Sequence, residues 1–295
     1  MKRRRADLAL AGVTCIWGAT FTLVKDALQD SSTLLFLAMR FSLAAVVLAL
    51  VFRRPAARPA PSGPPTGRAL FPGVLAGLCL YVAYWLQTAG LRFTTPSKSA
   101  FLTALCVVMV PLLAAAVYRV WPSPSEGLGV ATATAGMALL TLPGFGVQVN
   151  PGDLLTVGAA FGFAVHVMVV GHFSPTIGFE RLSVVQIATV AALTLASFWW
   201  AEPVMARWSV RLAFAVLVTG LLCTALAFTV QAWAQQHTTP TRTALIFTLE
   251  PVAAWVTSYL AVGEVLPVRA GIGALLILAG ILVVELKPGR AGGHP

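Results

Sequence analysis

The sequence predicts an all-α integral membrane protein whose chain crosses the bilayer ten times. Of the 295 residues, 58% are hydrophobic and only 10% are charged, and the mean hydropathy is +0.85, whereas about a quarter of the residues in a soluble domain are charged. Apolar stretches of about 20 residues, the length that spans a hydrocarbon layer of about 30 Å, recur along nearly the whole chain. Too few polar groups remain to cover a soluble surface.

The first predicted span, 6–25, follows the basic start Lys2-Arg3-Arg4-Arg5. This order resembles a secretory signal, but the apolar run has no convincing cleavage site, so we interpret it as an uncleaved first helix. The longest polar stretch, 53–68, is rich in proline and arginine and predicts a loop. The remaining spans are predicted at 32–52, 70–91, 96–118, 125–143, 152–173, 182–201, 211–234, 240–260 and 267–286.

The basic residues of the connections predict the orientation. With the amino terminus in the cytoplasm, thirteen Lys and Arg residues fall on the inner side and six on the outer side, and cytoplasmic connections are enriched in both residue types. We therefore expect a multi-pass protein of the cell (inner) membrane with both termini in the cytoplasm. The net charge of +10 is spread over short connections, which argues against a nucleic-acid partner.

An internal repeat relates the two halves of the chain. Segment 87–140 aligns with 231–284 at a constant offset of 144 residues, and Thr94–Ala100 (TTPSKSA) faces Thr238–Ala244 (TTPTRTA). The predicted repeats, 1–145 and 150–288, hold five spans each, and an odd number reverses the direction in which the second repeat enters the membrane. Inverted repeats of this kind are typical of secondary transporters. The same offset pairs Gln87 with Gln231, Gly129 with Gly273 and Gly136 with Gly280.

Several short motifs recur in the order and spacing of a known family. They are Trp17-Gly18, Phe21 and Lys25 in the first span, Arg40-Phe41 in the second, and Glu250-Pro251 with Gly263-Glu264 in the second repeat. Over essentially its whole length the chain resembles the drug/metabolite transporter superfamily, as an EamA-type ten-helix protein with two EamA repeats. Members of the superfamily are exporters or permeases for amino acids, nucleotide-related metabolites, sugar phosphate esters or drugs, so the resemblance implies transport without choosing the cargo.

The first repeat departs from the family pattern at one place. The offset of 144 sets Arg119 and Val120 opposite Gly263-Glu264. No acidic role is therefore carried over to the first repeat.

Charged residues deep in apolar spans are the first candidates for a transport site, because they are costly in a bilayer without a partner or a water-filled cavity. Glu250 lies about 15 Å into its predicted helix, near the midplane. It suits substrate or proton binding, and equally an interhelical hydrogen bond. For Arg40, two hypotheses are open: a pair with a carboxylate such as Glu250, and recognition of an anionic group on the cargo.

Other polar and aromatic residues of the spans are weaker candidates. His166 suits a proton relay, although a lone helical histidine is more often a hydrogen-bonded packing residue. A second set has the mixed character that small-molecule cavities require, but its aromatic members also suit the membrane interface. This set consists of Trp17, Tyr81, Tyr84, Gln87, Gln231 and Trp233.

Two repeated helix starts supply the candidates for gating. Thr95-Pro96 and Thr239-Pro240 each combine a good N-cap with proline at the first helical position. Lys98 and Arg242 follow one turn later, and each suits either a gate or snorkelling of the basic side chain to lipid headgroups. Pro251, next to Glu250, predicts a kink, and Pro111 is expected to act similarly in the fourth span.

The preferred function is a secondary transporter that exports small polar metabolites, with amino acids first, and the proton is a candidate coupling ion. The alternative is a multidrug or cationic drug exporter, followed by an intramembrane enzyme. The sequence has no HExxH, GxSxG or GxxxxGK[ST] motif, so we expect no enzyme activity and no cofactor. Its four cysteines lie in apolar spans without CxxC spacing, so we expect neither disulfides nor a metal site.

Overall fold

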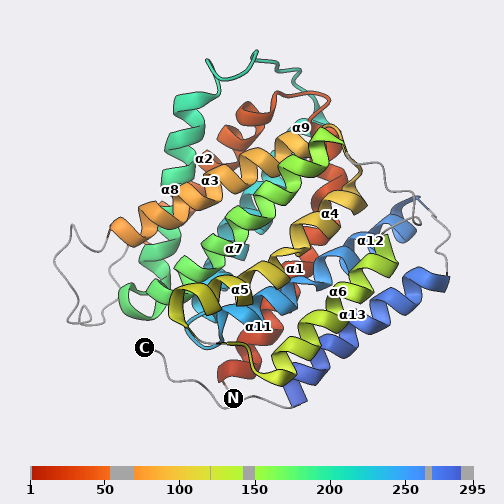
Figure 1. The fold of residues 1–295 in the computed structure, drawn as a ribbon. Coiled ribbons are helices and arrows are strands. Elements are labelled where there is room, and N and C mark those ends of the chain that lie inside the picture. Colours follow the sequence, from red (N-terminus) through yellow and green to blue (C-terminus); the bar gives the residue numbers. More distant parts are fainter. Residues whose placement is uncertain (1, 54–69, 120, 142–149, 263–267, 287–295) are drawn as a thin grey trace.

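The computed structural model describes residues 2–53, 70–119, 121–141, 150–262 and 268–286 (Figure 1). The first half of the chain forms α1 (Lys2–Ala27), α2 (Thr33–Val51), α3 (Phe71–Leu91), α4 (Pro96–Ala104), α5 (Cys106–Tyr118) and α6 (Pro124–Thr141). The second half forms α7 (Pro151–Ile177), α8 (Phe179–Ser197), α9 (Val210–Val218), η1 (Thr219–Leu226), α10 (Ala227–Ala234), α11 (Pro240–Phe247), α12 (Leu249–Val262) and α13 (Val268–Leu286). Residues 142–149, which contain the predicted repeat boundary, and the motif Gly263-Glu264 lie outside the described residues.

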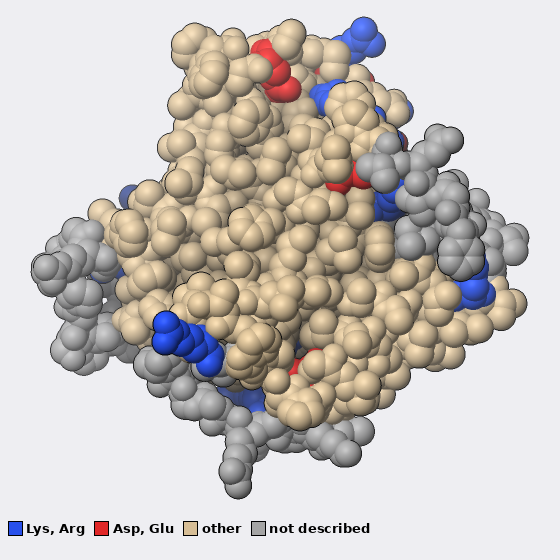
Figure 2. All heavy atoms as spheres, viewed as in Figure 1, with Lys and Arg blue, Asp and Glu red and all other residues tan. Residues whose placement is uncertain are grey.

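Each predicted span corresponds to a helix or to an interrupted helix, which confirms the all-α membrane fold. Among the described residues, seven helical stretches are long and apolar enough to cross a membrane. The other three predicted spans are α6, the interrupted pair α11–α12, and α13 with its apolar segment Gly271–Val284. Apolar side chains such as Leu112 and Leu154 are at least 60% exposed, and Figure 2 shows a broad area with few charged side chains, as lipid contact requires.

Helices α6 and α13 are equivalent in the two repeats and pack against each other. A Cβ atom added to Gly129 would lie 2.8 Å from the backbone oxygen of Gly280, and one added to Gly136 would lie 2.6 Å from that of Gly273. Gly273 and Gly280 are the counterparts of Gly129 and Gly136, so exchanging the repeats turns one contact into the other. The two helices run antiparallel about a two-fold axis, which is the arrangement of an inverted repeat.

The fourth and ninth predicted spans are each divided into two helices. The fourth breaks at Leu105 between α4 and α5, and the ninth breaks at Thr248 between α11 and α12. The N–H groups of Leu105 and Thr248 bond to the carbonyls of Leu102 and Leu245, three residues back, so each break is a tightened turn. Across the repeats, α5 packs against α11 and α4 against α12.

The two prolines relate differently to these breaks. Pro251 lacks the N–H that would bond to the carbonyl of Phe247, and the helix ends there, as predicted for the kink. Pro111 lies inside α5, which begins at Cys106. Its missing bond falls at the carbonyl of Val107, after the break at Leu105, so Pro111 does not account for that break.

The eighth predicted span, 211–234, contains a π-helix that the sequence did not reveal. The segment η1 interrupts the helix between α9 and α10, and the Thr224 hydroxyl donates to the Thr219 carbonyl, five residues earlier, at 2.8 Å. The equivalent part of the first repeat, α3, is a regular helix. Short π-helical segments inside α-helices often accompany functional sites.

Candidate functional site

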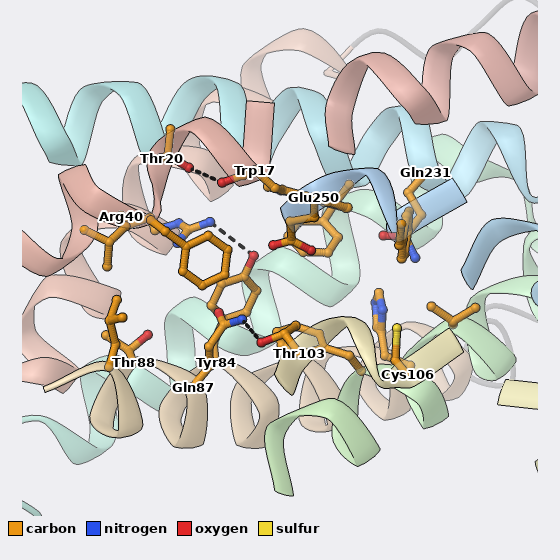
Figure 3. A pocket seen from close by; sticks show the side chains of 18 residues that line it. Trp17, Thr20, Arg40, Tyr84, Gln87, Thr88, Thr103, Cys106, Gln231 and Glu250 are labelled. Carbon is orange, nitrogen blue, oxygen red and sulfur yellow. Dashed lines mark hydrogen bonds between the residues drawn. The ribbon is translucent and has the colours of Figure 1, made fainter. Parts of the chain in front are cut away.

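A cavity lies in the middle of the helix bundle, beside the broken helices (Figure 3). It leaves about 70 Å³ for the centres of water-sized molecules, and one water needs about 10–15 Å³ on this measure. Several waters or a small solute therefore fit. The lining residues are Trp17, Thr20, Phe21, Val24, Arg40, Tyr84, Gln87, Thr88, Leu91, Thr103, Cys106, Phe163, His166, Val167, Phe228, Gln231, Phe247 and Glu250.

Aromatic rings form a large part of the cavity wall. Trp17 lies 5.4 Å from Phe228 and 5.3 Å from Phe247 between ring centroids. Tyr84 lies 5.2 Å from Phe163 in an edge-to-face arrangement. Tilted and edge-to-face rings pack favourably, so these contacts give the cavity a rigid apolar surface in which the polar side chains are set.

Arg40 brings a positive charge to the cavity from α2. The residue is only 4% exposed, its Nε donates to Thr224 Oγ1 at 2.7 Å, and its Nη2 donates to Tyr84 OH at 3.2 Å. The guanidinium carbon also lies 4.6 Å from the centroid of the Tyr84 ring. Thr224 and Tyr84 are neutral, so they orient the guanidinium without compensating its charge, and a carboxylate of a solute would complement it.

Glu250 brings a carboxyl group to the same cavity from the first turn of α12 (Figure 3). Helix α12 packs closely on α1 because Gly18 leaves room for the backbone oxygen of Glu250. The carboxyl of Glu250 has no hydrogen-bond partner among the residues that the structure describes. The interhelical hydrogen bond expected as one alternative is therefore absent from this part of the chain.

The predicted ion pair between Arg40 and Glu250 is not formed. Within the described part of the chain, the ion pairs are Lys98–Asp153 and Arg242–Asp7. Arg40 turns instead to the hydroxyls of Thr224 and Tyr84. The guanidinium group of Arg40 and the carboxyl group of Glu250 thus line one cavity without pairing with each other.

Gln87 and Gln231, equivalent in the two repeats, both line the cavity as predicted. Gln87 Nε2 donates to Thr103 Oγ1 at 2.9 Å, and Gln231 Nε2 donates to Gln235 Oε1 at 3.0 Å. The Oε1 atom of Gln231 is buried and has no partner in the described residues. Because an unpaired buried acceptor is costly, this oxygen is suited to accept a hydrogen bond from a solute.

His166 also lines the cavity, but its polar edge is occupied. Its Nε2 lies 2.9 Å from Gln186 Oε1, and its ring packs edge-on against Phe228 with centroids 5.6 Å apart. The residue is 2% exposed. These contacts favour the interpretation of His166 as a hydrogen-bonded packing residue over a proton relay.

Tyr81 and Trp233 do not line the cavity, contrary to expectation. The Tyr81 hydroxyl donates to Ser197 Oγ at 3.0 Å, so this ring is directed toward α8. Trp233 packs against His237, with ring centroids 5.5 Å apart. The sequence placed both side chains in the spans but did not specify which neighbouring helix each one faces.

Lys98 and Arg242 both form ion pairs, and both predicted N-caps are confirmed. Thr95 and Thr239 accept hydrogen bonds from the backbone N–H groups of Lys98 and Arg242. Lys98 Nζ lies 2.6 Å from Asp153, and Arg242 Nη2 lies 3.2 Å from Asp7. Arg242 is only 7% exposed, which favours a gate over snorkelling to lipid headgroups for this residue.

Sequence reasoning missed Asp7, Asp153 and Thr224. Asp7 and Asp153 each stand near the start of the first helix of a repeat, so their nearly equivalent positions were a usable signal. Thr224 had no such signal, because its hydroxyl reaches Arg40 from the π-helical segment.

Comparisons with known proteins agree with this architecture. An uncharacterized transporter of Archaeoglobus fulgidus is 30% identical over 288 residues, which cover 97% of this chain and 88% of that protein. The uncharacterized transporter YvbV of Bacillus subtilis is 25% identical over 295 residues, which cover 97% of this chain and 93% of that one. A solved crystal structure at 18% identity covers 98% of this chain and 99% of its own, with a TM-score of 0.77, and so shares the fold.

The family comparison also matches the chain twice. The model of the EamA-like transporter family matches residues 4–142 and again residues 150–286. Together the two matches cover nearly the whole chain. The protein therefore belongs to the EamA-like transporter family and is a transporter of the drug/metabolite superfamily.

Proposed function

We propose that this transporter exports small zwitterionic metabolites, amino acids first among them, by alternating access. One observation carries the proposal: Arg40, held by neutral groups, and Glu250, which has no ion-pair partner among the described residues, line the same cavity. A zwitterion complements both charges at once, with its carboxylate toward Arg40 and its ammonium group toward Glu250. The cargo would thus stabilise two buried charges that the protein leaves apart.

The amide and aromatic groups support the same class of cargo. The unpaired Oε1 of Gln231 adds a second acceptor beside Glu250 for an ammonium group. The rings of Trp17, Phe228 and Phe247 offer apolar contact to a side chain. A few placed polar groups in an apolar wall are typical of small-molecule sites.

A multidrug exporter is the second candidate, because a carboxyl group among aromatic rings also suits an aromatic cation. Arg40 distinguishes the amino-acid exporter from the multidrug exporter. Its charge in the same cavity repels a monovalent cation but attracts the carboxylate of an amino acid. We therefore favour the zwitterion.

The proposal also includes the orientation of the chain and the membrane in which it lies. The bias of basic residues supports an amino terminus in the cytoplasm and a location in the cell membrane. Glu250 is the proposed carrier of a coupling proton, because it is the carboxyl group that lines the cavity among the described residues. Transport then needs no covalent intermediate and no cofactor.

Counterflow in proteoliposomes tests the proposal. Vesicles loaded with one unlabelled amino acid are given its labelled form outside, across a panel of amino acids and a set of cationic dyes. We expect uptake of at least one amino acid above that of protein-free vesicles, and competition by amino acids but not by their amides or esters, which lack the carboxylate. Flux of cationic dyes without flux of any amino acid would establish the second candidate instead.

A further inference from the structure

The two ion pairs of the described chain lie at equivalent places in the two repeats. Lys98–Asp153 joins α4 of the first repeat to α7 of the second, and Arg242–Asp7 joins α11 of the second repeat to α1 of the first. Lys98 and Arg242 are separated by the repeat offset of 144. Each pair therefore ties the first helix of one repeat to the broken helix of the other.

The two pairs lie at opposite ends of the bundle. Asp7 stands near the start of α1. Near the end of α1, Lys25 Nζ donates to the backbone oxygen of Thr94, and the hydroxyl of Thr94 binds Asp153. From Asp7 to Lys25 the helix rises about 27 Å, which is close to the thickness of the hydrocarbon layer.

The central cavity lies between the two pairs. Trp17, Thr20 and Val24 line the cavity from the part of α1 between Asp7 and Lys25. A solute that leaves the cavity toward either end passes the helices that one ion pair holds together. We call Arg242–Asp7 the N-terminal gate and Lys98–Asp153 the distal gate.

The two copies differ in how completely they are bonded. At the distal gate, Asp153 Oδ2 lies 2.6 Å from Lys98 Nζ, and its Oδ1 accepts from Thr94 Oγ1 at 2.9 Å. At the N-terminal gate, the ion-pair distance is 3.2 Å, and Asp7 Oδ1 has no partner among the described residues. Thr238, the counterpart of Thr94, likewise has a hydroxyl without a described partner.

From this geometry we propose that the two ion pairs are alternating gates, and that Asp7 and Asp153 hold the cavity closed toward opposite membrane faces. Both ion pairs are formed here, and they differ in the second aspartate oxygen, which accepts a hydrogen bond at the distal gate and has no described partner at the N-terminal gate. In an inverted repeat, exchanging the conformations of the two halves exchanges the states of the two gates. A solute then reaches the cavity from one side at a time.

Cys106 lines the cavity and provides a native reporter of access that is independent of the cargo. Membrane vesicles of both orientations are treated with a membrane-impermeant maleimide, and mass spectrometry measures labelling of the peptide that carries Cys106. Protease removal of an amino-terminal tag identifies the side of the amino terminus. The readout needs no transported substrate, so it stands or fails separately from the proposed cargo.

Breaking each gate should shift access in opposite directions. We expect Asp7→Asn to raise labelling of Cys106 from the amino-terminal side about tenfold and to lower it from the other side, since a modest bias moves a two-state equilibrium by this factor. Asp153→Asn should do the reverse. The matched controls are Glu180→Gln in the first turn of α8 and Asp26→Asn near the end of α1, which should change neither side.

Exchanging the charges separates gating from a general loss of structure. The double variants Asp7→Arg/Arg242→Asp and Lys98→Asp/Asp153→Lys should restore labelling toward that of the natural protein. The proposal is overturned if the single variants leave both sides unchanged, if they raise labelling equally from both sides, or if the exchanged pairs do not restore it.

A cross-link tests the same two gates in the opposite sense, by holding each one closed. Cysteines at positions 94 and 153, joined by a short bifunctional maleimide, should block labelling of Cys106 from the distal side and leave the amino-terminal side open. Cysteines at positions 7 and 242 should block the amino-terminal side. Unchanged access from the cross-linked side would contradict the proposal.

Discussion

The two repeats build matching walls of the cavity but supply different chemistry. Gln87 and Gln231 are equivalent, and both line it. At another pair of equivalent positions that also line it, the first repeat has Cys106 and the second has Glu250. Duplication thus provides a symmetric frame for movement, while single substitutions within that frame provide the charges that bind cargo.

The same contrast holds for the helices behind these residues. In the first repeat, α3 is regular and carries Tyr84, whereas the equivalent helix of the second repeat contains η1 and carries Thr224. Tyr84 and Thr224 both bond to Arg40. One arginine is therefore oriented by both repeats, through a regular helix on one side and a π-helical segment on the other.

The largest expected effect is a difference in transport between variants at the equivalent positions 106 and 250. Glu250→Gln should lower amino-acid counterflow about 30-fold or more, because a lost charge pair at a binding site costs about 2 kcal/mol or more. Cys106→Ser should change it by less than about threefold, since a hydroxyl replaces a thiol of similar size. Rates are compared at equal amounts of reconstituted protein. Equal losses in the two variants would contradict the distinction between the repeats.

Glu250→Gln also tests proton coupling. A glutamine cannot gain or lose a proton, so the response of transport to an imposed pH gradient should disappear in this variant. Imposed pH gradients across variant and natural proteoliposomes measure it at equal protein density. An unchanged pH profile would exclude Glu250 as the coupling residue and leave its role in cargo binding to be judged from the counterflow rate.

The next largest effect tests whether Arg40 must be oriented by Thr224 and Tyr84 together. Arg40→Lys keeps the charge but loses the planar group that reaches Thr224 and Tyr84 together. We expect transport to fall about tenfold, which corresponds to the loss of one hydrogen bond to a charged group. Counterflow measures it, with Arg53→Lys, outside the cavity, as the matched control. Full transport by Arg40→Lys would show that charge alone is sufficient.

A smaller effect, on stability, tests the symmetry of the frame. Gly136→Ala and Gly280→Ala place a methyl group within 2.6 Å of a backbone oxygen across the α6–α13 contact, and overpacking of this kind costs about 1–3 kcal/mol. Because the positions are equivalent, both should lower the unfolding temperature similarly. Gly12→Ala, which meets open space, should not lower it. Thermal unfolding in detergent measures all three, and unequal shifts for the first two would argue against a symmetric contact.

The smallest effect is expected outside the cavity. Tyr81→Phe removes the hydrogen bond to Ser197 but no lining atom. We expect transport to change by less than about twofold, in line with one ordinary hydrogen bond at most. Tyr84→Phe, which removes a partner of Arg40, is the matched comparison and should lower counterflow more. The reverse order would mean that the cargo path runs beside Tyr81.

The sequence alone predicted most of the fold but only part of the site. Seven of the nine substrate-binding candidates line the cavity, because ionisable and amide groups in apolar spans need an interior position. Tyr81 and Trp233 do not, since an aromatic residue is compatible with either an interior or a lipid-facing position. The bond between Arg40 and Thr224 was also not predicted, because Thr224 lies 184 positions away in the sequence.

The sequence by itself determined the ten apolar spans and the two inverted sets of five. Both are properties of the chain, because span length is set by the bilayer and the offset of 144 is visible in the residues. Only the tertiary structure decided which polar groups meet, such as Asp7 with Arg242 across 235 positions. Lipid-facing and buried positions are both apolar in a membrane helix, so hydropathy does not specify how each helix is rotated, and packing settles that choice.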